Sequence, residues 1–298
     1  MRDLSVIVLS YNTKRITEDC LDSLYKSLLS SKILSEVIVV DNNSADGSTT
    51  MINKFKKRKS IDKIQIKSIF NNQNLGFPKG NNQGIKIASG KNILFLNSDV
   101  LIKNLKWDDL LEYFNKNSEV GVLTVKVLLT NGKVDPASHR GFPTVWNSFC
   151  YYSKLEKIFG KLPVANKLFG GYHMTYFSHN FTHQIDSPSG AFYLTRKKIL
   201  DSINGFDDKT FFLYGEDLDL SFRIKKMGYK ILYYPKFNVL HLKSVSGLKK
   251  KNLKIKNETR GHFYDAMKKF YAKHYYDKYP KFISKLVYFF IDFKKKTS

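Results

Sequence analysis

Apolar and polar residues alternate in blocks along the first hundred residues. Largely apolar runs at Leu4–Leu9, Glu36–Val40 and Asn92–Leu96 are typical of strands that are buried on both faces. Between the first two runs, Thr17–Leu29 carries leucines at the three- and four-residue spacing of an amphipathic helix. Because strands alternate with helices, we predict an α/β fold with a parallel sheet in this half of the chain.

The rest of the chain is less regular. We also predict strands over Ile64–Ile69 and Gly190–Thr195, and helices over Gly80–Ala88 and Asp217–Met227, the last of them ended by Gly228. The segment 130–188 is rich in aromatic residues, glycine and histidine, and shows no clear period. The last stretch is rich in lysine and tyrosine, and it predicts helical pieces with a break at Pro280.

Polar clusters follow three of the predicted strands at the point where each strand ends. They are Ser10-Tyr11-Asn12, Asp41-Asn42-Asn43 and Asn97-Ser98-Asp99. Each cluster alone is compatible with an ordinary turn. Because ligands of open α/β sheets bind beyond the carboxyl ends of the strands, three clusters at one edge indicate a binding site.

The densest acidic cluster of the chain, Gly215-Glu216-Asp217-Leu218-Asp219, opens a predicted helix. One interpretation is structural, since acids favour helix N-termini and Asp219 has Arg223 one turn later. In the other interpretation, a carboxylate of this cluster takes a proton from an acceptor hydroxyl.

Asp99 follows the predicted strand Asn92–Leu96, and His241 follows strand-like runs at Lys230–Tyr234 and Asn238–Leu240. Both residues are candidate metal ligands. Carboxylate oxygens suit Mg²⁺ and Mn²⁺, which usually take further oxygens from substrate phosphates, and imidazole also suits Mn²⁺-like metals. The alternatives are an Asx-type turn at Asp99 and a buried core histidine at position 241.

The loop NLGFPKGNNQG at 74–84 joins a predicted strand to a predicted helix. Its glycines permit a close backbone approach, and the helix N-terminus offers free N–H groups to an anion. The loop lacks the Walker sequence, so on its own it is weak evidence for a phosphate site.

Charge is distributed unevenly along the 298 residues, whose formal net charge is +24. From Leu242 to Ser298 there are sixteen Lys or Arg residues and four acids, so half of the excess positive charge lies in the last fifth. Such a segment can meet nucleic acid, an anionic membrane surface or only solvent. No nucleic-acid-binding motif accompanies the charge, so we expect no nucleic-acid partner.

The segment 281–296 contains apolar residues at helical spacing with lysines nearby. The apolar residues predicted on one face are Phe282, Ile283, Leu286, Val287, Phe290 and Phe293. This pattern is typical of a helix that lies on an anionic membrane, but also of a helix packed on the catalytic domain or at a dimer contact. No apolar stretch approaches the roughly 20 residues that a membrane-spanning helix needs.

Other features bear on location. The chain begins directly with a strand-like run, so we expect no signal peptide. Cys20 and Cys150 are predicted to be reduced thiols of a cytosolic protein.

Together these segments resemble the inverting family 2 glycosyltransferases of the GT-A fold, and especially their bacterial rhamnosyltransferase-like branch. The matching segments occur in family order and are VIVLSYN (6–12), VVDNNSADGS (39–48), the loop 74–84, LNSD (96–99), SGA (189–191) and FFLYGEDLDLSFR (211–223).

The resemblance implies a Rossmann-like nucleotide-binding GT-A fold with a mostly parallel central sheet over residues 1–245. Residues 1–100 would form the nucleotide-binding half, and residues 101–245 the acceptor-binding and catalytic half. Residues 246–298 would form a basic, aromatic and helical C-terminal extension.

The resemblance also implies roles for individual residues. The nucleotide-sugar donor would be contacted by Ser10, Tyr11, Asn12, Asp41, Asn43, Gly76, Asn82, Asn97 and Ser98. Asp99 matches the last residue of the family's DxD metal motif, and His241 lies where related enzymes can place a metal-binding histidine. Asn97 replaces the first acid of that motif, which removes one charge from the site. Asp217 matches the general base, with Glu216 as the second candidate.

The implied reaction transfers rhamnose or a similar sugar from a UDP- or dTDP-sugar, with Mn²⁺ or Mg²⁺ as cofactor. The acceptor would be a glycan or a polyprenyl-linked glycan of bacterial surface polysaccharide synthesis. Because one base and one displacement suffice, we expect inversion at the anomeric carbon. The expected location is the cytoplasm, on the inner face of the membrane if segment 281–296 binds lipid. The sequence is also compatible with a homo-oligomer.

The alternative is a catalytically inactive protein of the same fold that binds a nucleotide-sugar or a glycan. The intact Glu216-Asp217 pair argues against it.

Overall fold

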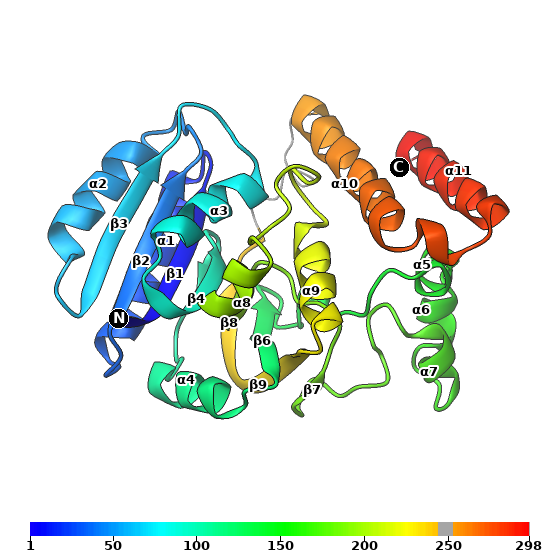
Figure 1. The fold of residues 1–298 in the computed structure, drawn as a ribbon, viewed down its shortest axis with the longest axis horizontal. Helices are drawn as coiled ribbons and strands as arrows, with labels where there is room; N and C mark the ends of the chain where they lie inside the picture. The colour runs from blue at the N-terminus through cyan, green and yellow to red at the C-terminus, as the bar shows by residue number, and fades with distance from the viewer. Residues whose placement is uncertain (244–252, 298) are drawn as a thin grey trace.

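A nine-stranded sheet forms the centre of the molecule in a computed structural model that describes residues 1–243 and 253–297 (Figure 1). The strands are β1 (Arg2–Ser10), β2 (Ser35–Asp41), β3 (Ile64–Phe70), β4 (Gly90–Asn97), β5 (Val100–Leu101), β6 (Val120–Leu129), β7 (His183–Gln184), β8 (Phe192–Arg196) and β9 (Lys230–His241). Their order across the sheet is β3-β2-β1-β4-β8-β6-β9-β5, and β7 pairs with β9.

Most of the long strands point in the same direction. β1 is parallel to β2 and β4, β2 is parallel to β3, and only the antiparallel β8 separates β4 from the parallel pair β6 and β9. Consequently Ser10, Asp41, Asn97 and His241, the last residues of four strands, lie at the same edge of the sheet. The predicted mostly parallel α/β sheet is confirmed.

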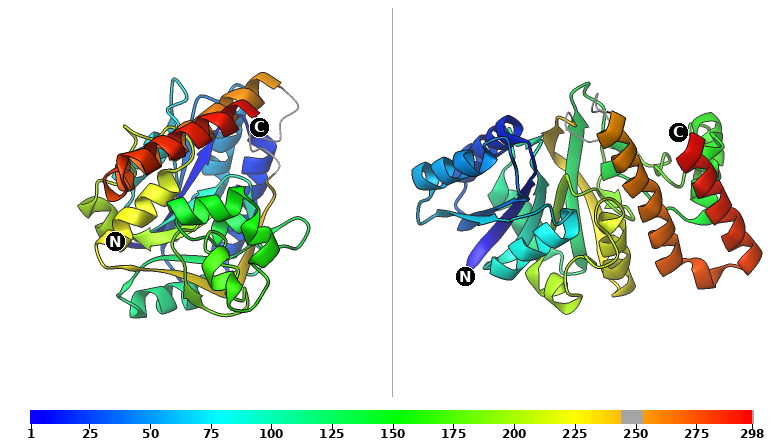
Figure 2. Two further views of the ribbon diagram at one scale, coloured as in Figure 1. Left: turned by 90° about the vertical axis from the view of Figure 1, so that its right-hand side faces the viewer. Right: turned by 90° about the horizontal axis from the view of Figure 1, so that it is seen from above.

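Helices cover both faces of the sheet (Figure 2). One face is covered by α1 (Lys14–Leu29), α2 (Ser48–Lys59) and α4 (Trp107–Lys116), the other by α3 (Phe77–Ile87), α8 (Lys197–Ser202) and α9 (Glu216–Lys226). The predicted leucine stripe of α1 packs into the first core, where Leu21, Leu24 and Leu28 are buried. Burial of each such side chain stabilises the fold by about 2 kcal/mol.

The segment without a clear period contains three short helices, α5 (Val145–Tyr152), α6 (Leu155–Phe159) and α7 (Ala165–Phe169). The longest of them has eight residues. Because that is little more than two turns, no amphipathic period develops in the sequence.

The described part of the C-terminal extension contains two α-helices, α10 (Leu253–His274) and α11 (Lys281–Thr297), separated by the predicted break at Pro280. α10 packs on the start of α9 through a cluster of apolar and aromatic side chains, namely Phe211, Leu218, Ala266, Phe270, Tyr271 and Tyr275. α11 turns back along α10, and both lie beside α5–α7 at the end of the molecule that is remote from β3 (Figures 1 and 2).

The predicted single apolar face of α11 is divided between two sides of the helix. Ser284 and Ile291 are buried, and Ile283 and Val287 on the flanks of that side are half-buried. The outward residues are Phe282, Leu286, Phe289, Phe290 and Phe293, with exposed fractions of 63%, 59%, 71%, 40% and 51%. Ile283 and Val287 are therefore less exposed than the other predicted apolar residues, and Phe289, which the prediction omitted, is the most exposed of the helix's phenylalanines.

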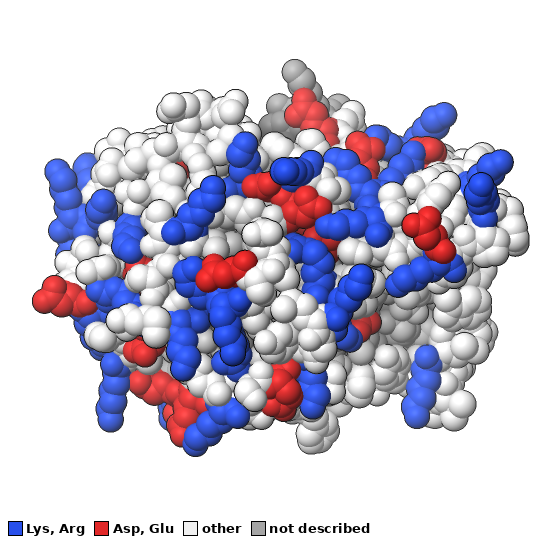
Figure 3. Space-filling model, in the orientation of Figure 1, with Lys and Arg blue, Asp and Glu red and all other residues white. Residues whose placement is uncertain are grey.

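Charged side chains are spread widely over the face seen in Figure 3, with acids between the basic residues and no single basic stripe. The part of this face over α5–α7 carries few charges. Within the described part of the chain, no helix is both long and apolar enough to cross a membrane. Cys20 and Cys150 are free thiols, as predicted, and both are buried.

Candidate active site

A cavity of about 1430 Å³ opens at the carboxyl edge of the sheet. Nine of the predicted site residues line it: Tyr11, Asn12, Gly76, Asn97, Ser98, Asp99, Glu216, Asp217 and His241. They come from five separate regions of the sequence. The topology therefore brings together most of the side chains that the motifs indicate.

The ends of β1 and β2 are tied together beside the cavity. The backbone N–H of Asn12 donates to Ser44 Oγ at 2.8 Å, and Asn12 Oδ1 accepts from the N–H of Ala45 at 2.8 Å. Asp41 accepts from the N–H of Ser44 at 3.0 Å. Asp41 and Asn43 do not line the cavity, so for both the nucleotide contact stays a prediction.

Ser10 and Asn82 also lie off the cavity wall, so their contacts with the donor likewise stay predictions. Ser10 is fully buried, and its hydroxyl is bonded to Thr17 Oγ1 at 3.1 Å. The amide of Asn82 donates to Phe206 O at 2.9 Å and to Asp208 Oδ2 at 3.0 Å. Both polar groups are occupied within the protein, so these residues support the loops around the site.

Asn42, which motif reasoning did not single out, does line the cavity. Its side-chain amide donates to Gly76 O at 3.1 Å. Its position between Asp41 and Asn43, two predicted donor contacts, is the signal in the sequence that could have identified it.

Gly76 allows two loops to meet. It has φ +81°, and a Cβ added there would lie 2.5 Å from Phe212 O. The next residue, Phe77, donates its backbone N–H to the same oxygen at 2.8 Å. Only glycine combines this conformation with such a close approach, and the result joins the 74–84 loop to the loop that leads to Asp217.

Asp99 and His241 lie side by side, with Asp99 Oδ1 3.1 Å from His241 Nε2. The other ring nitrogen, Nδ1, is 2.8 Å from Oδ2 of the buried Asp135, and Lys243 Nζ is 2.8 Å from Asp135 Oδ1. Burial alone would lower the pKa of His241, but its hydrogen bonds to Asp135 and Asp99 outweigh burial and raise this pKa to about 9. Sequence reasoning missed Asp135, which lies 106 residues from its partner in a segment without a clear period.

The Asp99–His241 pair fits one divalent cation. Carboxylate oxygen and imidazole nitrogen are suitable ligands, both residues line the cavity, and Asp135 fixes the ring as a carboxylate behind a metal-bound histidine does. Over residues 1–243 and 253–297, no group of three or more His, Cys, Asp or Glu is arranged to hold a metal. A metal would therefore take its remaining ligands from a diphosphate and water.

Asp217 forms an ion pair with Arg140, whose Nη2 is 2.6 Å from Asp217 Oδ2. The other oxygen, Oδ1, accepts from the backbone N–H of Leu218 at 2.7 Å. The two side chains are only 12% and 14% exposed, so the pair is largely shielded from solvent. Arg140 was missed because its contact spans 77 residues and no motif marks it.

Glu216 lines the same cavity but, unlike Asp217, has no hydrogen-bonded cation beside it in the described residues. Burial, and next the charge of Asp217, raise the pKa of Glu216 to about 8. Its Oε2 is buried and has no hydrogen-bond partner among the described residues. Glu216 is thus held largely protonated at neutral pH, whereas Asp217 is paired with a cation.

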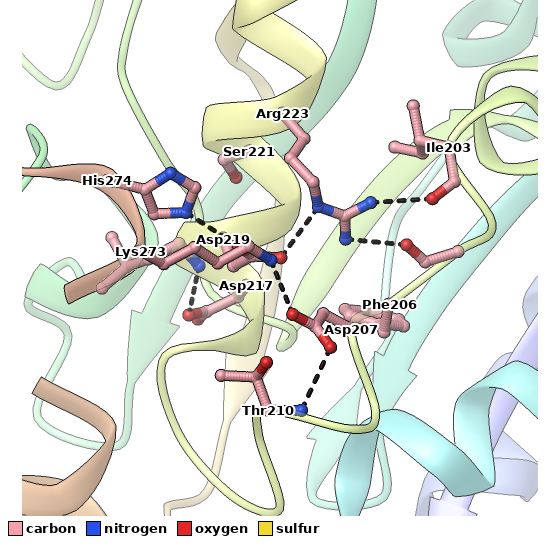
Figure 4. A network of polar contacts seen from close by, with 12 residues as sticks. Ile203, Phe206, Asp207, Thr210, Asp217, Asp219, Ser221, Arg223, Lys273 and His274 are labelled. Atoms are coloured by element: carbon pink, nitrogen blue, oxygen red, sulfur yellow. Dashed lines mark hydrogen bonds and ion pairs between the residues drawn. The ribbon is translucent and has the colours of Figure 1, made fainter. Parts of the chain in front are cut away.

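Asp219 is the structural acid of the cluster (Figure 4). Its Oδ2 is 2.8 Å from Arg223 Nε, as the structural interpretation predicted. Its Oδ1 is 2.7 Å from Lys273 Nζ and 2.8 Å from His274 Nε2, and Lys273 also contacts Asp207 at 2.6 Å. Burial tends to raise the pKa of Asp219, but these partners outweigh it and lower the pKa. The helix start of α9 is thereby bound to α10.

Residues 5–181 match the family model described as glycosyl transferase family 2. The match covers more than half of the 298 residues. The chain belongs to this family. The predicted family is therefore confirmed.

The chain is similar to curated proteins with different names, including the following two. O-antigen biosynthesis protein RfbC of Myxococcus xanthus is 28% identical over 231 residues, which cover 76% of this chain and 16% of that protein. Poly(ribitol-phosphate) beta-glucosyltransferase of Bacillus spizizenii is 32% identical over 138 residues, which cover 45% of this chain and 20% of that protein. The chain spans a fifth or less of the length of these two relatives.

Solved structures confirm the GT-A fold of the family 2 chain. Staphylococcus aureus TarS aligns with a TM-score of 0.53 at 19% identity, covering 91% of this chain and 44% of that one. The Pyrobaculum calidifontis mannosyltransferase PcManGT, solved with GDP-Man and Mn²⁺, aligns with a TM-score of 0.56 at 17% identity, covering 92% and 66%.

The buried acid Glu216 predicts a pH dependence of stability. Folded Glu216 keeps its proton to about pH 8, whereas an unfolded chain loses it near 4.5. In that window the folded state binds more protons than the unfolded state, so stability falls as pH rises. Glu216→Gln cannot ionise, so we expect its melting temperature relative to wild type to rise between about pH 5 and about pH 8.5 in thermal unfolding.

The control is Glu119→Gln, which alters an exposed acid whose side chain is 49% accessible. Its difference from wild type should not change with pH. A pH-independent difference for Glu216→Gln as well would show that Glu216 ionises normally in the folded protein.

Proposed function

We propose that this chain is an inverting glycosyltransferase that moves a sugar from a nucleotide diphosphate to a glycan acceptor. The observation that carries the proposal is one cavity that holds a carboxylate suited to proton transfer, Asp217, and the pair Asp99 and His241 suited to a divalent cation. The family assignment supports it.

Asp217 is the proposed general base. The acceptor hydroxyl gives its proton to Asp217 as its oxygen bonds to the anomeric carbon, and the bond from that carbon to the diphosphate oxygen breaks. A single displacement of this kind inverts the anomeric configuration. The ion pair with Arg140 fixes the direction of the carboxylate, and each carboxylate oxygen keeps a further lone pair for the acceptor.

Glu216 is less suited to be the base, since its raised pKa keeps it largely protonated at neutral pH. A protonated carboxyl group cannot accept a further proton. It can instead donate a hydrogen bond, and its unpartnered Oε2 lies buried at the cavity wall.

Asp99 and His241 are the proposed ligands of Mn²⁺ or Mg²⁺. When bound there, such an ion neutralises the negative charge of the diphosphate leaving group. Asp135 keeps Nδ1 of His241 occupied, so Nε2 is the nitrogen directed to the ion. Because Asn97 is neutral, the site has one acid fewer than a DxD motif.

The donor is a UDP- or dTDP-sugar, with rhamnose or a similar sugar to be transferred. TarS has been solved with UDP-GlcNAc, which supports a nucleoside diphosphate sugar of this kind. The names of the two curated relatives, which refer to O-antigen and poly(ribitol-phosphate), support an acceptor in bacterial surface polysaccharide synthesis. Residues 1–100 would bind the nucleotide and residues 101–245 the acceptor.

A peripheral site of action on the inner face of the membrane is proposed from α11. This helix carries five lysines and one acid, and its outward side presents the row of exposed residues Phe282, Leu286, Phe289, Phe290 and Phe293. Apolar side chains flanked by lysines suit the surface of an anionic bilayer.

The alternative to a glycosyltransferase is a protein of the same fold that binds a nucleotide-sugar or a glycan without turnover. Hydrolysis of the donor distinguishes these two functions.

Loss of the proposed base should lower turnover. For Asp217→Asn we expect about 10²–10⁴-fold slower release of UDP from a UDP-sugar, because general-base assistance contributes that much. Binding of UDP should change little, and this readout also checks that the variant is folded. Glu216→Gln is the matched variant; if it loses the turnover and Asp217→Asn keeps it, the base is Glu216.

Loss of the proposed metal ligand should remove the response to Mn²⁺. In a thermal-shift panel of UDP-, dTDP- and GDP-sugars, the best donor should stabilise the wild type more with Mn²⁺ than without. At a ligand concentration of 100 times Kd, the stabilisation is about 2.7 kcal/mol. Asp99→Ala should lose the increment due to Mn²⁺, and Asp62→Ala, which alters an exposed acid, should keep it. An unchanged metal titration of Asp99→Ala would refute its assignment.

Removal of the outward apolar side chains should abolish membrane binding. The unaltered 298-residue chain should float with liposomes that contain phosphatidylglycerol, and Phe282→Asp/Phe293→Asp should not, since it adds two charges to the side of α11 that would face the lipid. The control Leu34→Asp/Ile61→Asp changes residues that are 48% and 43% exposed elsewhere on the surface. Equal flotation of all three proteins would contradict the proposed surface.

A further inference from the structure

The cavity continues beyond the catalytic residues into a part that we call the apolar arm. Its walls are Tyr152 of α5, Met267 and Tyr271 of α10, and Ile283, Val287 and Phe290 of α11. Helix α5 closes on the extension directly, since the rings of Tyr152 and Phe290 are 5.7 Å apart. The arm is therefore built by the extension together with a segment that sequence patterns did not resolve.

The two hydroxyl groups among these six wall residues are already engaged within the walls. The hydroxyl of Tyr152 donates to Met267 Sδ at 3.4 Å, and the hydroxyl of Tyr271 is 2.9 Å from Ser284 Oγ. The other four wall residues have no strong hydrogen-bonding side-chain group. A sugar placed here would lose its hydrogen bonds to water without replacement, which costs free energy, whereas a hydrocarbon would gain from burial.

Polarity changes along the cavity. Its inner end presents Asp99, Arg140 and Asp217, which are groups suited to a diphosphate and a sugar hydroxyl. Its outer part is lined by Leu286 and Phe289, which are 59% and 71% exposed. A ligand that fills the whole cavity is therefore polar at one end and apolar at the other.

Positive charge lies beside the arm. Helix α11 carries five lysines and one acid. One of these lysines, Lys294, lies over the rings of Tyr152 and Phe290, with Nζ 5.9 Å and 5.7 Å from the ring centroids. This charge complements a phosphate-bearing lipid better than a neutral one.

We propose that the apolar arm binds the hydrocarbon chain of a lipid-linked, phosphate-bearing acceptor, whose sugar hydroxyl then lies at Asp217. The inference rests on the proposed glycosyltransferase function and names the class of acceptor. The chain enters between Leu286 and Phe289, on the same side of α11 that would face a bilayer.

The test uses the full-length protein and two soluble probes, geranyl phosphate and farnesyl phosphate, at concentrations where both are monomeric. Burial of only two more carbons is worth about tenfold in affinity, so farnesyl phosphate should bind at least about tenfold more tightly. Calorimetry gives the two dissociation constants without turnover and without a membrane. Equal affinity for both probes would overturn the proposal.

Matched variants locate the binding. Leu286→Asp/Phe289→Asp places two charges at the mouth on exposed positions, so the fold is spared, and it should weaken binding of farnesyl phosphate at least about tenfold. Phe282→Asp/Phe293→Asp makes the same chemical change on the same helix at positions that do not line the cavity, and it should keep that binding. Equal losses in both variants would show adsorption to the whole outer side of α11 and would overturn the arm.

The lipid site in the arm and the glycosyltransferase activity can be refuted separately. If chain length has no effect on binding but UDP-sugar hydrolysis persists and depends on Asp217, the arm is refuted and the glycosyltransferase stands. If farnesyl phosphate binds as expected but no nucleotide-sugar binds or is hydrolysed, the arm is a lipid site and its role for an acceptor is refuted.

Discussion

Three carboxylates within four residues, all near the N-terminus of α9, impose the constraint on which the site depends. Glu216, Asp217 and Asp219 are largely shielded from water, and like charges at this spacing destabilise one another unless each is compensated. The protein resolves the conflict in three different ways. Glu216 retains its proton, Asp217 pairs with Arg140, and Asp219 is surrounded by Arg223, Lys273 and His274.

Each compensation recruits a different part of the chain. Arg140 belongs to the irregular middle segment, and Lys273 and His274 belong to the C-terminal extension. The acidic turn therefore holds in place the two regions that form the far wall of the cavity. A carboxylate paired with a fixed cation is also a carboxylate of fixed direction, which is what proton transfer from a bound hydroxyl requires.

The sequence predicted the parts of the site whose positions follow from sheet geometry. Asp99 and His241 end up 3.1 Å apart because β5, which begins directly after Asp99, pairs with the end of β9 and places Val100 opposite His241. Asp135 and Arg140 could not be predicted from the sequence, since their partners are 106 and 77 residues away. Both residues also precede helices that are too short to show a period. Ser10 and Asn82 do not line the cavity, so a motif identifies a loop but not which of its side chains faces the cavity.

The same clamp that compensates Asp219 also fixes the distance between the chemistry and the apolar arm. Helix α10 ends with Lys273 and His274, which bind Asp219. Met267 and Tyr271 of the same helix line the arm. Because α10 is bonded to the first turn of α9, the wall that would hold a lipid chain and the carboxylate that would take the proton belong to one packed unit. A lipid-linked acceptor anchored in the arm would thus present its hydroxyl groups at a set distance from its chain. In such an arrangement the helix clamp, and not the sugar pocket alone, selects which sugar of the acceptor reaches Asp217.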